Sequence, residues 1–168
     1  YNGPGNNEDI VKAMVVGPDG TVYVTGLSHG SGSSYDYATI AYSGVGIPLW
    51  TNRYIGPVVN GHDSARSIAM GSNGNVLVTV SSVGVGSSDD FATIAYSRAG
   101  VPLWTNRYNG PWNGSDSANA VAIGADGSVY VTGYVHGSGN TRDYATVAYS
   151  AVGATLWANF YGGSGSGE

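Results

Sequence analysis

One eight-residue segment occurs three times in this chain of 168 residues, almost unchanged. Residues 36–43 read DYATIAYS, residues 90–97 read DFATIAYS and residues 143–150 read DYATVAYS. The starting positions are 54 residues apart (36 to 90) and then 53 residues apart (90 to 143). A period of this size is typical of stacked supersecondary units that cannot bury their hydrophobic faces alone. We therefore expect three copies of one structural module.

Features outside this segment recur in step with it. Each copy has an aspartate shortly before its first apolar run, an Asp-Gly or Asn-Gly pair near its first turn, and a tryptophan close to its end. The recurring residues are Asp9, Asp63 and Asp116; Asp19-Gly20, Asn73-Gly74 and Asp126-Gly127; and Trp50, Trp104 and Trp157.

The pattern within one repeat predicts four short strands. In the first repeat these are residues 12–16, 21–25, 37–43 and 48–54. Asp19-Gly20 between β-forming residues is a strong hairpin signal, and the TVYVT segment at 21–25 consists of residues that favour strands. The Gly/Ser-rich residues 30–34 predict a loop, and Pro48 stands at a first strand position, where a missing donor is tolerated.

Both faces of the predicted strands carry apolar or small side chains. In residues 37–43, for example, Ala38 and Ile40 share one face, while Tyr37 and Ala41 share the other. A sheet with a free face would alternate apolar with polar residues, so each sheet is expected to lie between two neighbours. Four antiparallel strands with both faces covered describe a β-propeller blade.

The predicted fold class is therefore all-β: three four-stranded antiparallel propeller blades that form part of a larger ring. We expect residues 1–168 to form a single propeller segment. Its blades are expected at approximately 9–54, 63–108 and 117–162, and the Gly/Ser-rich residues 163–168 are expected to be a flexible tail.

The repeat motifs also carry a family resemblance. The pattern DGxVYVTG at 19–26, with its counterpart at 126–133, is followed by D-[YF]-A-T-[IV]-A-Y-S and by G-x-x-LW. These motifs resemble the bacterial β-propeller repeats found in tandem on secreted and cell-surface proteins, and the resemblance covers the chain three times. It implies a propeller fold, an extracellular setting and no catalytic residues. The second repeat departs most, with Asn73 and Val80 in place of Asp and Gly.

The expected blades do not make a closed ring by themselves. Closed propellers have about four to eight blades, and three would leave two apolar sheet faces of the kind that mark interaction surfaces. We expect a homo-oligomer, preferably a two-fold dimer with six blades. A larger ring of three chains, a filament, and a longer propeller of which this chain is a part remain alternatives. The opening residues 1–4 match 54–57 and 108–111, so they are expected to be the tail of a further repeat.

Composition restricts the choice of partner. Only 10% of residues are charged and the formal net charge is −5, so no basic stripe is available for nucleic acid. No apolar run approaches 18 residues, and membrane insertion is not expected. Cysteine is absent, which excludes disulfides and thiolate metal sites. Low charge with abundant Gly, Ser, Asn and Tyr favours a secreted or cell-surface location. We expect no cofactor.

The repeated carboxylates are interpreted as structural. A residue that recurs once per blade is best explained by the same structural task in each, because catalytic groups need environments that differ from one another. No metal site is expected, since Asp19, Asn73 and Asp126 lie in separate turns. Motifs of serine hydrolases, zinc proteases and phosphate loops are absent, so no enzyme activity is expected. The carboxylates interpreted as structural are Asp36, Asp90, Asp143, Asp9, Asp63 and Asp116.

Antiparallel pairing allows a specific prediction for three of these carboxylates. If the turn before the fourth strand centres on residues 45–46, Ala38 lies opposite Arg53, and Asp36 lies diagonally beside Arg53. The same register places Asp90 beside Arg107. In the third repeat Phe160 replaces the arginine, so Asp143 is expected to turn to backbone amides or to Arg142.

Trp112 is the strongest candidate for a ligand contact. It lies in the connection between the second and third repeats, where the other connections have Gly5 and Val58. A tryptophan beside Asn113 and His62 would suit a sugar ring, although the same residue is also suited to pack over a blade seam. His29 and His136 are interpreted as surface loop residues. The leading hypothesis is a non-enzymatic structural or adhesion scaffold. The alternative is a carbohydrate-binding lectin, and a hydrolase or lyase is a weaker third.

Overall fold

The computed structural model describes residues 1–32, 34–58 and 60–162. The predicted flexible tail at 163–168 lies outside the described residues. Twelve strands account for most of the described chain, and its only helical element is a single 3-10 turn, η1 (Ser138–Asn140). The strands are β1 (Asp9–Val16), β2 (Val22–His29), β3 (Tyr35–Tyr42), β4 (Pro48–Tyr54), β5 (Asp63–Met70), β6 (Val76–Val83), β7 (Asp89–Tyr96), β8 (Pro102–Tyr108), β9 (Ser117–Ile123), β10 (Val129–His136), β11 (Arg142–Tyr149) and β12 (Thr155–Tyr161).

These strands form three four-stranded antiparallel sheets, each built from four consecutive strands. The first sheet contains β1–β4, the second β5–β8 and the third β9–β12, and within each the strands pair in chain order. The all-β class and the four strands per repeat are thus confirmed. Consecutive strands pair with one another, so no strand of one sheet pairs with a strand of another sheet.

The Asp-Gly signal marks the first turn of each sheet. In the first, the Gly17 amide donates to the Thr21 carbonyl at 2.8 Å, and Gly20 adopts φ +81°, a region open to glycine. The Asp19 carboxylate accepts a hydrogen bond from the Thr21 amide. In the second sheet Asn73 accepts from the Asn75 amide at 3.0 Å in the same way, so the replacement of Asp leaves this turn unchanged.

The first two strands are longer than predicted. Pairing extends from Val16↔Val22 to Asp9↔Ser28, and the register shifts by one residue at a bulge between Val11 and Ala13. The bulge interrupts the alternation of side chains from which strands are recognised, so the sequence pattern did not reveal the extension of β1.

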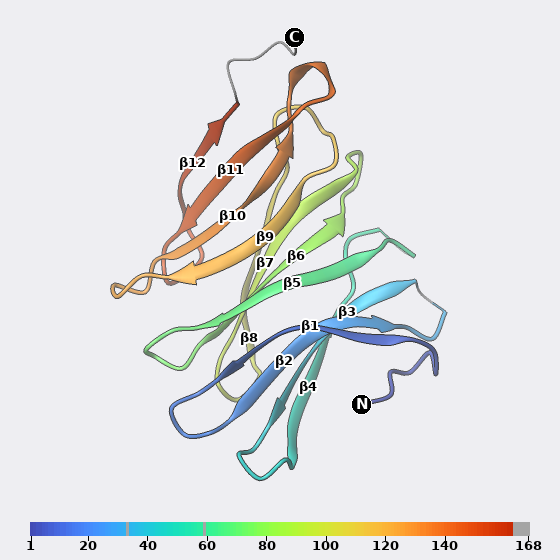
Figure 1. The fold of residues 1–168 in the computed structure, drawn as a ribbon, viewed down its shortest axis with the longest axis vertical. Coiled ribbons are helices and arrows are strands. Elements are labelled where there is room, and N and C mark those ends of the chain that lie inside the picture. Colours follow the sequence, from blue (N-terminus) through green and yellow to red (C-terminus); the bar gives the residue numbers. More distant parts are fainter. Residues whose placement is uncertain (33, 59, 163–168) are drawn as a thin grey trace.

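The sheets pack face to face in chain order. The first strands β1, β5 and β9 follow one another through the molecule (Figure 1), and β5 also contacts β2 and β3, as β9 contacts β6 and β7. One apolar cluster joins the first sheet to the second, and another joins the second to the third. Within the described chain, the second sheet alone is therefore covered on both faces, and its strands β6 and β7 are buried almost throughout.

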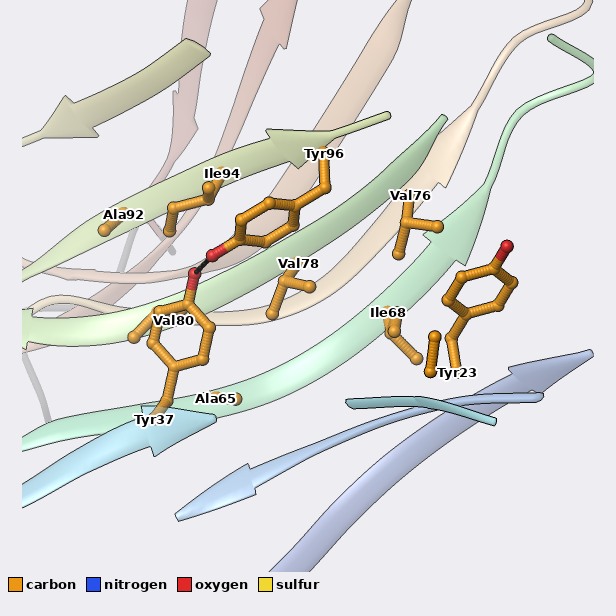
Figure 2. Packing of buried hydrophobic residues seen from close by; sticks show 11 residues of the cluster. Tyr23, Tyr37, Ala65, Ile68, Val76, Val78, Val80, Ala92, Ile94 and Tyr96 are labelled. Atoms are coloured by element: carbon orange, nitrogen blue, oxygen red, sulfur yellow. Dashed lines mark hydrogen bonds between the residues drawn. The ribbon is translucent and has the colours of Figure 1, made fainter. Parts of the chain in front are cut away.

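A buried hydroxyl pair crosses the first of these interfaces. The Tyr37 hydroxyl on β3 and the Tyr96 hydroxyl on β7 lie 2.7 Å apart among valines and Ile94 (Figure 2). Burial raises the pKa of Tyr37 well above its usual value. Each hydroxyl is therefore neutral at ordinary pH, and each satisfies the other in an apolar environment.

Two sheet faces have no neighbour among the described residues. We define the leading face as the surface of the first sheet that carries Val11, Met14 and Val16, and the trailing face as the surface of the third sheet that carries Tyr130, Tyr144 and Trp157. Val11 is 68% exposed and Tyr144 is 71% exposed. Their counterparts where a neighbour is present, Ala65 and Tyr37, are fully buried.

Loss of a single hydroxyl should test the Tyr37–Tyr96 pair. Tyr37→Phe should lower the free energy of unfolding by about 1–3 kcal/mol, because the Tyr96 hydroxyl is left buried without a partner. The double variant Tyr37→Phe/Tyr96→Phe should be more stable than the sum of the two single losses predicts. Chemical denaturation of the three variants measures this coupling. Additive losses would contradict the pairing.

Candidate functional site

The first two sheets each carry a pair of side chains that donate hydrogen bonds to a turn of the next sheet. The indole N–H of Trp50 on β4 donates to the Arg98 carbonyl at 3.0 Å. Two residues further along, the Asn52 side-chain amide donates to the Gly100 carbonyl at 2.6 Å. Both acceptors belong to the turn between β7 and β8. We call this arrangement the Trp–Asn hook.

The same hook joins the second sheet to the third. Trp104 donates to the Ala151 carbonyl at 3.2 Å, and Asn106 donates to the Gly153 carbonyl at 2.5 Å. Since both interfaces use equivalent residues in equivalent bonds, the hook is a property of the repeat. The two apolar clusters lie at these interfaces as well, and the hook adds directional hydrogen bonds to them.

The turn that receives the hook requires glycine. Gly100 has φ +81° and Gly153 has φ +85°, which are left-handed conformations. A Cβ atom on Gly100 would lie 2.6 Å from the ring of Trp50, and one on Gly153 would lie 2.8 Å from the ring of Trp104. Glycine is thus needed both for the backbone angle and for the close approach of the indole.

The predicted register of the third and fourth strands is confirmed. Ala38 pairs with Arg53, and the Arg53 guanidinium lies 2.9 Å from the Asp36 carboxylate. In the second sheet Arg107 lies 3.0 Å from Asp90. Each arginine also donates to the carbonyl of a serine on the second strand, Ser28 or Ser82. These arginines therefore tie together the outer three strands of their sheets.

The third sheet departs from this scheme, as the sequence indicated. Phe160 replaces the arginine and pairs with Ala145. The partner that the structure gives Asp143 is the Thr141 hydroxyl, at 3.4 Å. The expected alternatives, backbone amides or Arg142, are not seen among the described contacts. The Arg142 guanidinium lies over the ring of Tyr134, 4.5 Å from its centroid, because cation–π attraction is available there.

The second set of repeated aspartates anchors the connections between repeats. Asp9, Asp63 and Asp116 accept hydrogen bonds from the amides of Gly3, Gly56 and Gly110, at 2.7, 2.6 and 2.5 Å. Each bond ties the chain that enters a sheet to that sheet's first strand. Such a task is consistent with the structural interpretation of these residues.

The pKa values of these three carboxylates are shifted in different directions, although burial acts to raise each of them. Burial raises the pKa of Asp63 and of Asp116, although backbone amides lower each in part. For Asp9, burial also acts to raise the pKa. Hydrogen bonds from Ser28 and the Gly3 amide, together with the Arg53 charge, outweigh it, so the pKa is lowered. Raised carboxyl pKa values can mark catalytic acids, but here the carboxylates bind backbone amides.

Trp112 lies on the surface of the connection between β8 and β9, where 58% of it is exposed. Its neighbour Asn113 adopts φ +51°, and the Asn109 side-chain amide donates to Asn113 at 2.7 Å. The equivalent residues Asn2 and Asn6 make the same bond at 2.7 Å in the segment before β1. Asn113 thus has a turn-forming role that recurs, whereas Trp112 is a side chain that only this connection presents.

His62 lies in a different group of side chains. Its ring centroid is 4.9 Å from that of Tyr35, which in turn is 5.3 Å from His29. The Tyr35 hydroxyl donates to Glu8 at 3.0 Å. Within the described residues, no hydrogen bond or ring contact joins His62 to Trp112. Sequence reasoning missed this cluster because Tyr35 lies just outside the repeated segment.

Among the residues that the structure describes, no group of three His, Cys, Asp or Glu side chains is placed to hold a metal ion. The described helical content includes no segment long and apolar enough to cross a membrane.

Comparison with known proteins supports the fold alone. No protein-family model matches the sequence, and no curated protein matches it. A crystal structure of a protein of unknown function from Bacteroides caccae is similar at a TM-score of 0.58 with 10% identity, over 94% of this chain and 48% of that one. A crystal structure described as the eukaryotic initiation factor has a TM-score of 0.55 and 10% identity, over 94% and 33%. This chain thus spans about half and a third of their lengths.

A third similar structure is a fucose lectin from Kordia zhangzhouensis in complex with methyl-fucoside. It has a TM-score of 0.48 and 9% identity, over 88% of this chain and 96% of the lectin. The similarity is too low for any functional argument.

Substitution of Gly100 should test the seat of the hook, by which we mean the turn that receives the Trp and Asn side chains. Gly100→Ala should lower the free energy of unfolding by about 1–2 kcal/mol for the left-handed backbone, plus about 1–3 kcal/mol for displacement of Trp50. Gly74→Ala is the matched control, because Gly74 has the same φ of +81° and the new Cβ would meet only ordinary contacts. Equal losses in thermal and chemical denaturation would show that Trp50 is not seated as described.

The arginine-paired aspartates allow a comparison within one chain. Asp90→Asn should cost about 1.5–3 kcal/mol, because it weakens the charged hydrogen bonds of a partly buried Arg107. Asp143→Asn, at the same repeat position but without an arginine partner, should cost less. Urea denaturation measures both. If Asp143→Asn were as damaging as Asp90→Asn, the loss would not come from the weakened contacts of Arg107.

Proposed function

We propose that this protein is a non-enzymatic extracellular scaffold, structural or adhesive, whose three sheets are propeller blades in a ring completed by further sheets of the same kind. The observation that carries this proposal is the pair of uncovered apolar faces at the two ends of the stack. Two identical interfaces within the chain cover the equivalent faces of the second sheet. The uncovered faces match these interfaces in residue type and position, so further sheets can cover them in the same way.

Two further observations support a larger assembly. In the Bacteroides caccae structure and the initiation-factor structure, the matched region is only part of a longer chain. Closed propellers have about four to eight blades, so two copies of this chain make a six-bladed ring with two-fold symmetry. A ring of three copies, a filament, and blades supplied by a longer chain are the alternatives. The low content of charged residues and the motif resemblance support a secreted or cell-surface location.

Light scattering across a range of protein concentrations tests this proposal. A two-copy ring gives twice the chain mass of 17.1 kDa, and electron microscopy should show a closed particle. A mass of three copies supports the larger ring. A stable monomer at every concentration overturns completion by self-association.

A specific observation also supports carbohydrate binding as a second candidate function. Trp112 exposes an aromatic surface that the connections at Gly5 and Val58 lack, and exposed aromatic rings beside polar groups suit the apolar face of a sugar. If the candidate is correct, a glycan array should give binding that Trp112→Ala abolishes. Val85→Ala, which alters an exposed residue of another loop, should bind as the unaltered protein does. An array without bound glycans excludes this candidate.

A further inference from the structure

We propose that the partner of the trailing face is the leading face of a second copy of this chain, joined head to tail by the hook of Trp157 and Asn159. This inference rests on the proposed function and adds the residues and the orientation of the contact. It follows from continuity with the two interfaces inside the chain, which supply a template for each half of the new one.

The donor half is already arranged on β12. Trp157 and Asn159 stand where Trp50 and Asn52, and again Trp104 and Asn106, stand in the other sheets. The Trp157 ring lies 6.1 Å from the Tyr130 ring, much as Trp50 lies 5.8 Å from Tyr23. Trp157 is 41% exposed. Within the described residues, neither Trp157 nor Asn159 donates a side-chain hydrogen bond.

The acceptor half is the turn between β3 and β4. The Gly46 amide donates to the Ser43 carbonyl at 2.9 Å, as the equivalent glycines do in the turns that receive Trp50 and Trp104. Gly46 has φ +84°, close to the +81° of Gly100. A Cβ on Gly46 would meet nothing within 4 Å, whereas the same position on Gly100 is filled by an indole ring. By equivalence, the Gly44 and Gly46 carbonyls are the acceptors for Trp157 and Asn159.

The apolar surfaces around the hook are complementary as well. Inside the chain, Tyr23 and Tyr37 of the first sheet belong to the same buried cluster as Ala65 and Ile68 of β5. The trailing face presents Tyr130 and Tyr144 at the positions of these tyrosines. The leading face presents Val11 and Met14 at the positions of Ala65 and Ile68. Each face therefore carries the half of the interface that the other lacks.

In the single chain, Tyr1 fills a position on the leading face that a tyrosine of the neighbouring sheet fills at the internal interfaces. The Arg53 guanidinium donates to the Tyr1 hydroxyl at 3.2 Å, as Arg107 donates to the Tyr54 hydroxyl at 3.2 Å. Tyr161 is the equivalent residue at the end of β12, so Tyr161 of the second copy takes this place when the copies dock. Tyr1 is more than half exposed and must move aside. The variant Tyr1→Ala should therefore associate at least as tightly as the unaltered chain.

The donor residues and the acceptor turn lie at opposite ends of the chain's stack of sheets, and this placement determines the symmetry of the assembly. Each copy carries one donor face and one acceptor face on different sheets, so the contact is heterologous. A heterologous contact forms a closed ring when its rotation closes and a filament when it does not. In a ring of two copies, both interfaces are the same.

Sedimentation equilibrium of matched variants tests the inference. Trp157→Ala and Gly46→Ala should each weaken self-association about tenfold or more, the loss expected when a buried aromatic anchor is removed or blocked. Leu156→Ala is the control for the first, because Leu156 and its equivalents Leu49 and Leu103 are exposed whether or not a neighbour is present. Gly86→Ala is the control for the second, since Gly86 has φ +77° in open space away from both end faces.

A mixing experiment tests the head-to-tail orientation. In an equimolar mixture of Trp157→Ala and Gly46→Ala, one interface per mixed pair combines an intact hook with an intact seat. The mixture should therefore associate more strongly than either variant alone. Near-ultraviolet circular dichroism of each variant checks that its fold is kept. A mixture that associates no better than its components overturns the orientation.

The outcomes separate this inference from the proposed function. If the unaltered chain self-associates and Trp157→Ala does so equally well, the hook is wrong and the scaffold proposal stands. If the unaltered chain stays monomeric at all concentrations, the proposed completion by self-association fails, and the hook fails with it. Weakening by Leu156→Ala as strong as that by Trp157→Ala would also overturn the hook.

Discussion

Packing of one sheet face against the next is the interaction on which the rest of this structure depends. Each repeat closes its own strand pairing, so no hydrogen-bonded ladder joins one sheet to another. The sheets are held together by the two apolar clusters, which place Val78 and Val131 in complete burial. Burial of apolar surface stabilises this contact by about 25 cal/mol for each Å² removed from water.

Polar contacts add directional bonds between the sheets and within them. Apolar contacts are non-directional, whereas the bonds of Trp50 and Asn52 to two carbonyls of one turn have defined geometry. The arginine–aspartate pairs work within a sheet and hold the third and fourth strands to the second. Buried ion pairs add little net stability once the cost of desolvation is counted, so their main effect here is on register.

The same logic connects the scaffold to its proposed assembly. The second sheet has a neighbouring sheet on each face. The first and third sheets each have a neighbour on one face only, among the described residues. A surface of this kind must find a partner or remain a site of aggregation. In the proposed assembly, the hook would add specificity against unrelated apolar surfaces, because the turns that receive an indole inside the chain each present a left-handed glycine, Gly100 or Gly153.

The amino-acid sequence by itself determined the three repeats, the four strands of each sheet, the apolar character of both sheet faces and the Asp36–Arg53 register, because periodicity and alternation are local consequences of strand geometry. The tertiary structure alone decided which carbonyls receive Trp50, why Gly100 must be glycine, and that His62 meets Tyr35. These facts depend on how two sheets are placed relative to each other. No local pattern records that placement, because it arises from the packing of residues about 50 positions apart.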